Sequence, residues 1–169
     1  GYAALINCVN ITVRGSNFEN NFQSIIIFST NNSRILNNNV TNINEGIWLS
    51  SSSNNIISGN NITNNQYGIY FYYSSNNFIT GNNIANNGDD GIALYSSNYN
   101  KISGNNMTAN NRYGIVLEDS SNNGIVGNNI KNSTYGIALR YSSNYNSIVG
   151  NNIKNNRYGI WLFSSSSNS

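Results

Sequence analysis

The sequence of 169 residues contains no histidine, no proline and a single cysteine, and only 14 of its side chains are charged (8 basic and 6 acidic). Without histidine, and with Cys8 alone, the chain cannot build a zinc finger, a His-based metal centre or a Ser-His-Asp or Cys-His catalytic group. A disulfide within the chain needs a second cysteine and is excluded as well. The composition therefore predicts no metal site and no cofactor.

Concentrated charge and long apolar segments are also scarce. The net charge of +2 comes from scattered basic residues, so binding to nucleic acid is not expected. No apolar stretch approaches the roughly 18 residues of a membrane-spanning segment, and membrane insertion is not expected either. Asn and Ser are instead by far the most frequent residue types. Disorder is not predicted, because 38% of the residues are hydrophobic and they recur at fixed spacing.

A repeat with a period of about 22–23 residues covers almost the whole chain. One motif, Gly-Asn-Asn-Ile, begins at Gly59, Gly81, Gly127 and Gly150, and a copy with Met in place of Ile begins at Gly104. A second motif, Gly-Ile, runs in phase with it at Gly46, Gly68, Gly91, Gly114, Gly136 and Gly159. The separation between the first glycine and the second varies by a single position. No insertion is long enough to form a large functional loop.

Each repeat predicts three short strands, because apolar and polar residues alternate between Ser-Ser-Asn and Asn-Asn turn signals. Stacked repeats can bury their Ile, Leu and Val positions in one interior, which a single repeat cannot do. We therefore predict an all-β, right-handed, single-stranded parallel β-helix of about seven to eight coils, forming one domain over residues 1–169. Neither end carries a polar cap, so we expect a piece of a longer protein or a unit whose ends stack on other subunits.

The abundant Asn residues have a structural interpretation. Asn tolerates the left-handed backbone of a sharp corner, and its amide can bond to the same amide one coil away. We predict a structural ladder of Asn38, Asn60, Asn82, Asn105, Asn128 and Asn151. A second stack is expected at the next corner, formed by Asn42, Asn64, Asn86, Asn132 and Asn155.

The repeat also resembles a known family. The segments Gly114-Ile115-Val116-Leu117 and Ile125-Val126-Gly127-Asn128-Asn129-Ile130 resemble the parallel β-helix repeats of NosD-like proteins and of microbial surface proteins, and this resemblance covers essentially the whole chain. It implies the β-helix fold. NosD is associated with copper-site maturation, but copper favours His, Cys or Met ligands, and Met107 falls in an interior Ile column. More loosely, the repeats are similar to those of carbohydrate-binding proteins and sugar hydrolases.

Acidic residues give little indication of catalysis. Cleavage of a glycosidic bond needs two carboxyl groups about 5–10 Å apart. Glu118 lies five strand positions beyond the Asp90 column, which is about 16 Å. Glu45 and Asp90 are expected in the same column, two coils apart, which is about 9–10 Å. The sequence places no basic residue and no cleft-forming loop next to them. We therefore expect no catalytic residues and interpret the acids as solvated turn residues or an incidental cation site at Asp89-Asp90.

Aromatic side chains gather on the outward side of the Gly-Ile-x-Leu strands. The predicted binding face consists of Trp48, Tyr70, Tyr72, Tyr73, Tyr95, Trp161 and Phe163. Such a face either stiffens the sheet by cross-strand stacking, packs against a neighbouring solenoid, or stacks on sugar rings. Solvated proteins seldom expose contiguous aromatic patches without a use.

Glycosylation sequons predict an extracellular or cell-surface location. The candidate acceptors are Asn10, Asn31, Asn39, Asn61, Asn106 and Asn132. Together these features favour a non-catalytic, structural or adhesive β-solenoid of a cell surface or filament, with self-association or neighbouring surface proteins as partners. The alternative is a carbohydrate-binding β-helix module whose partner is a polysaccharide; a polysaccharide hydrolase or lyase ranks third.

Overall fold

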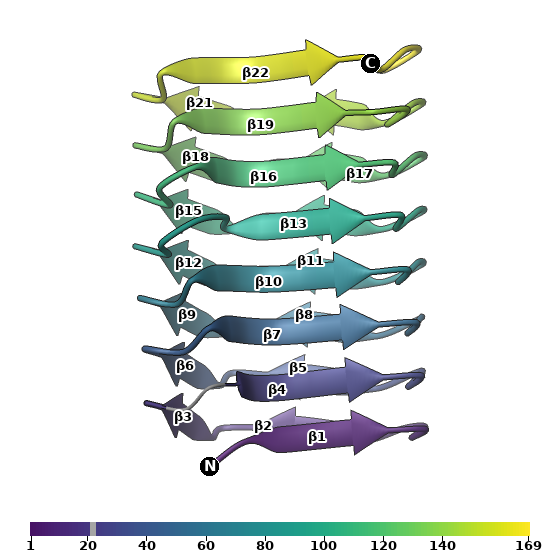
Figure 1. Cartoon of the computed structure of the whole chain (residues 1–169), viewed down its shortest axis with the longest axis vertical. Coiled ribbons are helices and arrows are strands. Elements are labelled where there is room, and N and C mark those ends of the chain that lie inside the picture. The colour runs from purple at the N-terminus through teal and green to yellow at the C-terminus, as the bar shows by residue number, and fades with distance from the viewer. Residues whose placement is uncertain (21–22) are drawn as a thin grey trace.

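The computed structural model describes residues 1–20 and 23–169, and it coils them so that each turn adds one strand to each of three parallel sheets (Figure 1). Sheet 1 holds the longest strands, β1 (Ala3–Ile6), β4 (Gln23–Phe28), β7 (Glu45–Ser50), β10 (Tyr67–Tyr72), β13 (Ile92–Tyr95), β16 (Tyr113–Glu118), β19 (Tyr135–Arg140) and β22 (Tyr158–Phe163). The predicted β-solenoid of about seven coils is confirmed.

Sheets 2 and 3 consist of three-residue strands. Sheet 2 contains β2 (Thr12–Arg14), β5 (Arg34–Leu36), β8 (Ile56–Ser58), β11 (Phe78–Thr80), β14 (Lys101–Ser103), β17 (Gly124–Val126) and β20 (Ser147–Val149). Sheet 3 contains β3 (Asn17–Glu19), β6 (Asn39–Thr41), β9 (Asn61–Thr63), β12 (Asn83–Ala85), β15 (Asn106–Thr108), β18 (Asn129–Lys131) and β21 (Asn152–Lys154). Neighbours along each sheet pair in parallel with equivalent residues in register, for example Ile69 with Ile92.

Columns of identical or similar apolar side chains fill the interior. Ile47, Ile69, Ile92, Ile115 and Ile137 are fully buried in one column. Phe71 occupies a neighbouring column of Leu residues and is also fully buried, and Met107 lies in the core as expected. A one-residue slip of any strand would turn its apolar side chains outward, so the alternating pattern fixes the register.

Asn residues stabilise the corners through hydrogen bonds between coils. In the predicted ladder, each Asn Nδ2 donates to Oδ1 of the equivalent Asn one coil further along, at 2.9–3.0 Å. The second expected stack is displaced by one residue. Asn42, Asn64 and Asn86 adopt the left-handed backbone and lie exposed, and it is the following residue, such as Asn87, whose amide bonds to the next coil. The left-handed residue turns the chain, so its own side chain points away from the interior.

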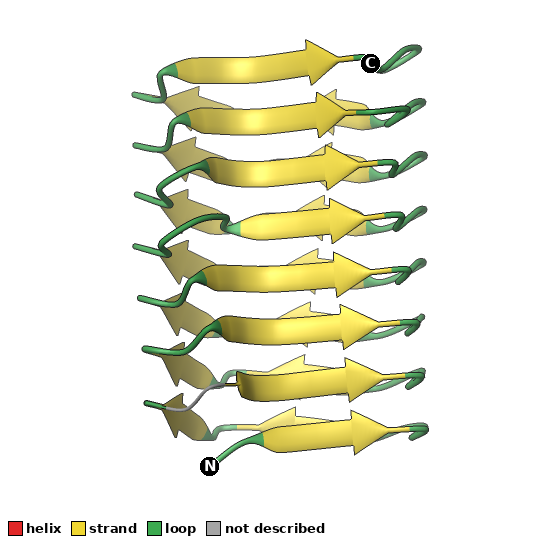
Figure 2. Cartoon of the chain, in the orientation of Figure 1, coloured by secondary structure: helices red, strands yellow, loops and turns green. Residues whose placement is uncertain are grey.

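Strand β13 departs from the regular pattern. It begins at Ile92, whereas β10 begins at Tyr67, two residues before the Ile that pairs with Ile92. A longer loop leads into β13 (Figure 2), since Gly81 and Gly91 lie one position further apart along the chain than Gly59 and Gly68. The next corner, between Gly104 and Gly114, is lengthened in the same way. The corners that lead into sheet 1 are therefore lengthened at two successive coils, and of the two strands that follow these corners only β13 is shortened.

Candidate active site

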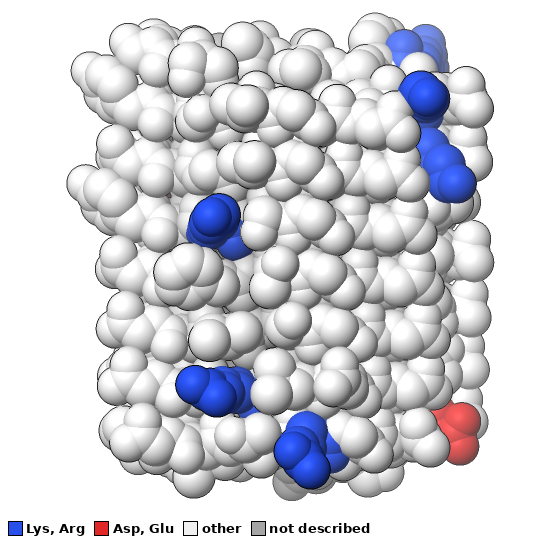
Figure 3. Space-filling view, turned by 180° about the vertical axis from the view of Figure 1, so that it is seen from behind, with Lys and Arg blue, Asp and Glu red and all other residues white. Residues whose placement is uncertain are grey.

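The outer face of sheet 1 has a floor of small side chains beneath larger aromatic ones. Ala93, Val116 and Ala138 point outward, yet all three are fully buried, because tyrosines of the neighbouring columns cover them. Tyr113 packs on this floor and is itself only 4% exposed. The face opposite sheet 1 carries scattered basic groups and almost no acidic ones (Figure 3), so most of the acidic residues lie in or beside sheet 1.

Asp90 is the most unusual residue on this face. It lies in the irregular loop before β13, it is 1% exposed, and neither carboxylate oxygen accepts a hydrogen bond of good geometry. Loss of solvation and, secondly, repulsion from Asp89 raise the pKa of Asp90 to about 7, although Arg112 and the backbone N–H of Tyr113 oppose the shift. A buried carboxyl that titrates near neutral pH can either take up or release a proton at physiological pH.

Tyrosines surround this carboxyl. Burial and then the charge of Asp89 raise the pKa of Tyr67, and the Asp89 carboxylate lies close to its hydroxyl. Burial also raises the pKa values of Tyr70 and Tyr95, and the negative charge of Asp90 adds to both shifts. The Tyr67 and Tyr70 rings are 5.7 Å apart and the Tyr70 and Tyr95 rings 5.2 Å apart. These hydroxyl groups therefore remain protonated and can act as proton donors.

A basic side chain borders the same cluster. Arg112 lies in the second irregular corner, where its guanidinium covers the Tyr113 ring at 4.8 Å and its Nη1 atom is 4.0 Å from Asp89 Oδ1. About half of the side chain is exposed, so a ligand on the outer face can reach it. A planar guanidinium in this position can bind a carboxylate of a ligand through two hydrogen bonds.

A second group of charges lies further along the face. Arg140 Nη1 is 3.7 Å from Glu118 Oε2 and donates a hydrogen bond to the Tyr113 hydroxyl at 3.3 Å. The Arg140 guanidinium also lies 5.8 Å from the centre of the Trp161 ring. Glu118 is therefore paired with Arg140, in contrast to Asp90.

The predicted aromatic face divides into two parts. Tyr70 and Tyr95 are half-buried beside Asp90, and Tyr72 and Tyr73 contact each other edge to face with ring centres 4.4 Å apart. Trp161 and Phe163 stack at 5.5 Å near the other end of the sheet. Trp48 is half-buried on β7, one coil before Tyr70.

The candidate glycosylation acceptors lie on other faces. Asn10, Asn61, Asn106 and Asn132 are exposed, whereas Asn31 and Asn39 are half-buried. In sheet 3, Asn39, Asn61 and Asn106 belong to an outer amide ladder, in which Asn61 Nδ2 donates to Asn39 Oδ1 at 2.8 Å. Within residues 1–20 and 23–169, no group of three or more His, Cys, Asp or Glu side chains is placed to hold a metal ion. The same residues contain no helix long and apolar enough to cross a membrane.

Sequence reasoning missed Asp90, Tyr67 and Arg112 as members of one site. The sequence-based prediction was based on the distances between acidic residues, because it looked for a pair of carboxyl groups. This site instead combines one carboxyl group with tyrosines and an arginine. A signal was present in the spacing, because the two corners that are lengthened by one position are those that carry Asp90 and Arg112.

The fold and the sequence assign the chain to a family. The model of the right-handed β-helix region matches residues 1–77 and 37–169, and the chain therefore belongs to the right-handed β-helix family. This match confirms the predicted handedness. The narrower NosD-like subtype stays a prediction. No curated protein sequence matches the chain.

Solved structures with a similar fold include several enzymes. The A-module of mannuronan C-5 epimerase AlgE6 from Azotobacter vinelandii is 19% identical, with a TM-score of 0.72 over 99% of this chain and 58% of the epimerase chain. A variant of the periplasmic alginate epimerase AlgG is 22% identical, with a TM-score of 0.73 over 98% and 47%. A DFA-IIIase from Arthrobacter chlorophenolicus is 13% identical, with a TM-score of 0.72 over 95% and 50%. The chain thus spans about half the length of the proteins it resembles.

These comparisons correct the functional prediction. The similar structures are carbohydrate-active enzymes, which contradicts the interpretation of the chain as a non-catalytic structural or adhesive solenoid and the expectation that it is not an enzyme. The alternative interpretation, a carbohydrate-binding β-helix module, agrees better with these similar structures. The physical reason for the error is that the repeat describes the regular coils, whereas the unusual carboxyl lies where the repeat is broken.

Proposed function

We propose that the chain is the polysaccharide-binding β-helix of a carbohydrate-active enzyme, and that the outer face of sheet 1 around Asp90 transfers protons on a uronate-containing chain. The observation that carries this proposal is the buried, unpaired carboxyl of Asp90 among Tyr67, Tyr70 and Tyr95. Strongly shifted carboxyl groups gather at functional sites. The names of two similar folds, a mannuronan C-5 epimerase and an alginate epimerase, support the choice of substrate.

Asp90 is 1% exposed in the free chain, so the proposed reaction begins when the side chains that cover it move aside and its carboxyl is accessible and ionised. This carboxylate removes the proton from the sugar carbon next to the uronate carboxylate, and the electron pair of the C–H bond delocalises into that carboxylate. Arg112, whose side chain is about half exposed, binds the sugar carboxylate and stabilises the added charge. A tyrosine hydroxyl, from Tyr67 or Tyr70, returns a proton to the opposite side of the carbon, and the configuration is inverted.

Hydrolysis is less well supported by the same geometry. A hydrolase needs a second carboxyl across the glycosidic bond. The other acids near Asp90 already have partners: Glu118 pairs with Arg140 at 3.7 Å, Asp89 lies 4.0 Å from Arg112, and Glu45 accepts a hydrogen bond from Asn44. Proton transfer needs one base, one acid and one cation, and Asp90, its tyrosines and Arg112 supply all three.

The aromatic face completes the proposal as a sugar platform. Trp48, Tyr70 and Tyr95 would stack on sugar rings near Asp90, and Trp161 with Phe163 would hold a more distant part of the chain. Aromatic rings offer large apolar contact areas to the C–H faces of sugars. A polysaccharide partner also agrees with the extracellular location expected from the sequons.

The test is proton exchange on polymannuronate in deuterated water, followed by NMR. We expect the wild-type chain to exchange the hydrogen at the carbon beside the carboxylate and to produce the epimer. Asp90→Asn should lower the rate by about 10²–10⁴-fold. Asp119→Asn is the matched control, because Asp119 is exposed just after β16, and it should leave the rate unchanged. Equal rates for wild type and Asp90→Asn would rule out Asp90 as the base.

A further inference from the structure

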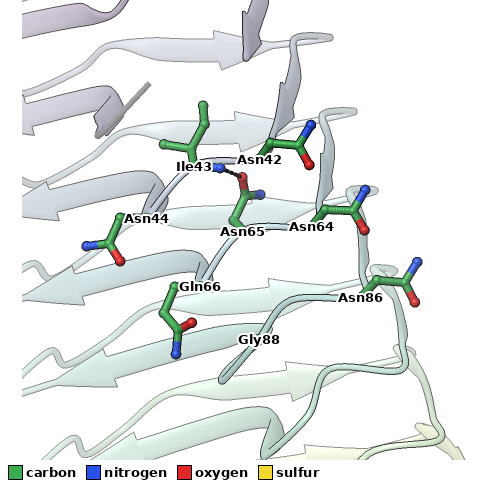
Figure 4. A pocket seen from close by; sticks show the side chains of 8 residues that line it. All are labelled: Asn42, Ile43, Asn44, Asn64, Asn65, Gln66, Asn86 and Gly88. Carbon is green, nitrogen blue, oxygen red and sulfur yellow. Dashed lines mark hydrogen bonds between the residues drawn. The ribbon is translucent and has the colours of Figure 1, made fainter. Parts of the chain in front are cut away.

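A second concave site lies beside the Asp90 cluster, at the corner where sheet 3 leads into sheet 1. It is a cavity of about 590 Å³ whose lining includes Asn42, Asn64, Asn86, Asn44, Gln66 and Gly88. Cavities of this size accommodate small ligands. Figure 4 shows the side chains of Asn42, Asn64 and Asn86 extending side by side from successive coils, with Asn44 and Gln66 on the other side of the corner.

The amides of this cavity are not needed to form the corner. Asn42, Asn64 and Asn86 have φ values of 58°, 58° and 56°. Ala109 occupies the equivalent position in the next coil with φ of 54°, so the left-handed turn forms without an amide side chain. The buried stack at this corner is made by the following residues, such as Asn65 and Asn87. The outer amides are therefore free to bind a ligand.

Gly88 lines the cavity next to the side chain of Gln66. A Cβ atom at this position would lie 2.8 Å from Gln66 Oε1, so any larger residue would displace the Gln66 side chain. Gly88 also belongs to the corner that has one extra residue, and its N–H donates to Asn65 O at 2.7 Å. The lengthened corner that carries Asp90 beside sheet 1 thus also forms one wall of this cavity.

The chemistry of the lining indicates the class of ligand. Each side-chain amide offers N–H donors and a carbonyl acceptor without net charge, and equivalent amides lie one coil apart, at about 4.8 Å. Neighbouring hydroxyl groups of a sugar need this combination of donors and acceptors. The residues that line the cavity include no Lys or Arg, so a sugar carboxylate would gain no ion pair there.

The chain segments that line the cavity continue directly into the Asp90 cluster. Tyr67 directly follows Gln66, and Asp90 follows Gly88 by two residues. The N–H of Asp89 donates to Gln66 O at 2.8 Å, which connects the two segments. A ligand bound in the cavity would therefore reach the edge of the Asp90 cluster.

We propose that this amide-lined cavity is a sugar subsite for a neutral, hydroxyl-bearing residue of the same saccharide whose uronate lies at Asp90. The inference rests on the proposed function and extends it, since it predicts a substrate that contains neutral as well as acidic sugars. It also predicts that the saccharide crosses the corner from sheet 3 onto sheet 1.

The test uses a neutral probe, so that it does not depend on turnover. Mannotetraose and cellotetraose are titrated separately into ¹⁵N-labelled protein, and the side-chain amide signals are followed by NMR. We expect shifts of the Asn42, Asn64 and Asn86 amides with at least one probe. The double variant Asn64→Gly with Asn86→Gly retains the left-handed backbone and should weaken binding about tenfold.

A matched control is available in the same column. Asn132 and Asn155 are exposed and left-handed, with φ values of 60° and 55°, but they lie outside the cavity. The double variant Asn132→Gly with Asn155→Gly should bind the neutral probe as wild type does. Equal weakening by both double variants would overturn the subsite, because the effect would then be a general one on stability.

The remaining outcomes separate the subsite from the proposed function. Shifts at Tyr67 and Tyr70 on addition of a mannuronate hexasaccharide, with no response of the cavity to either neutral probe, would overturn the subsite and leave the proposed function intact. Binding in the cavity together with unchanged turnover in Asp90→Asn would support the subsite and reject the proposed function. No shifts at either place with any probe would reject both.

Discussion

Asp90 combines three properties that seldom occur together in a folded protein: it is acidic, it is 1% exposed, and neither of its oxygens accepts a hydrogen bond of good geometry. A carboxylate in this position is costly, because burial removes its hydration, and Arg112 and the backbone N–H of Tyr113 compensate only in part. The cost is smaller for the protonated form, which is why the pKa rises to about 7. The tyrosines around it are shifted in the same direction, so the cluster offers a base and protonated acids at the same pH.

The pH dependence of the proposed reaction follows from this shift. Asp90 must be ionised to accept a proton, and its pKa of about 7 predicts a rate that rises about tenfold per pH unit below that value and levels above it. The rate of proton exchange on polymannuronate, measured from about pH 5 to about pH 9, checks this. A rate that falls through pH 7 would instead identify Asp90 as the acid.

The Asp90 carboxyl should make the free energy of unfolding decrease as pH rises, whereas an ordinary salt-bridged acid makes it increase. The pKa of Asp90 is raised from 3.8 to about 7 on folding, so the folded state binds more protons between these values. The contribution of Asp90 to stability is therefore greatest below about pH 4 and is lost as pH rises through about 7.

Asp90→Asn removes this titration and tests the sign. At about pH 8 the variant should exceed wild type in free energy of unfolding by roughly 3 kcal/mol, and near pH 4 the two should be similar. Urea denaturation at both pH values measures the difference. Asp119→Asn, at an exposed corner, serves as the control. A variant that is less stable than wild type at pH 8 would show that the Asp90 carboxylate is well solvated or paired.

At the scale of the structural element, two Asn ladders run along the solenoid with different surroundings. The buried ladder includes Asn82, which donates to Ile57 O and Asn105 Oδ1 and accepts from Asn60. The outer ladder of sheet 3 includes Asn83, which is exposed and donates to Asn61 Oδ1 at 2.7 Å. Water can replace the bonds of the outer ladder but not those of the buried one.

These adjacent residues provide a matched pair of variants. Asn82→Ala leaves buried carbonyl and N–H groups without partners, and it should lower the free energy of unfolding by about 2–3 kcal/mol. Asn83→Ala should change it by no more than about 0.5 kcal/mol. Chemical denaturation of both proteins measures the contrast. Similar losses would mean that both ladders stabilise the coils equally.

The outer aromatic residues of sheet 1 are predicted to act in binding rather than folding. Trp48 lies on the outer side of β7 and is half-buried, and its buried indole N–H has no hydrogen-bond partner. Trp48→Ala should therefore leave the melting temperature nearly unchanged and weaken oligouronate binding, by about 1–2 kcal/mol for one lost stacking contact. Calorimetric titration and thermal unfolding measure the two effects. A variant that unfolds would show that Trp48 is part of the packing of the sheet.

The sequence predicted the regular part of these elements because each position recurs once per coil. The buried ladder from Asn38 to Asn151 could be placed from spacing alone, since the same residue type repeats at one corner. The second stack was predicted one residue too early, because spacing does not tell the left-handed residue, such as Asn64, from its inward-pointing neighbour Asn65.

For the whole molecule, the repeat predicted the architecture but not the function. Stacking of equivalent coils follows from alternation and turn signals, and the three sheets agree with it. The function that we propose depends on the position where the coils differ, at the lengthened corners that carry Asp90 and Arg112. The shift of the Asp90 pKa depends on burial beside Tyr113 and Asp89, and no sequence pattern gives the burial of a loop residue.

The most direct test of the proposed site is the crystal structure of the Asp90→Asn protein with a bound mannuronate hexasaccharide. We predict that the saccharide lies on the outer face of sheet 1, with a uronate carboxylate at Arg112 and the adjacent C–H group facing the side chain at position 90. Tyr67 or Tyr70 should lie on the opposite side of that carbon. A saccharide bound on sheet 2 or sheet 3, away from position 90, would contradict the proposed function.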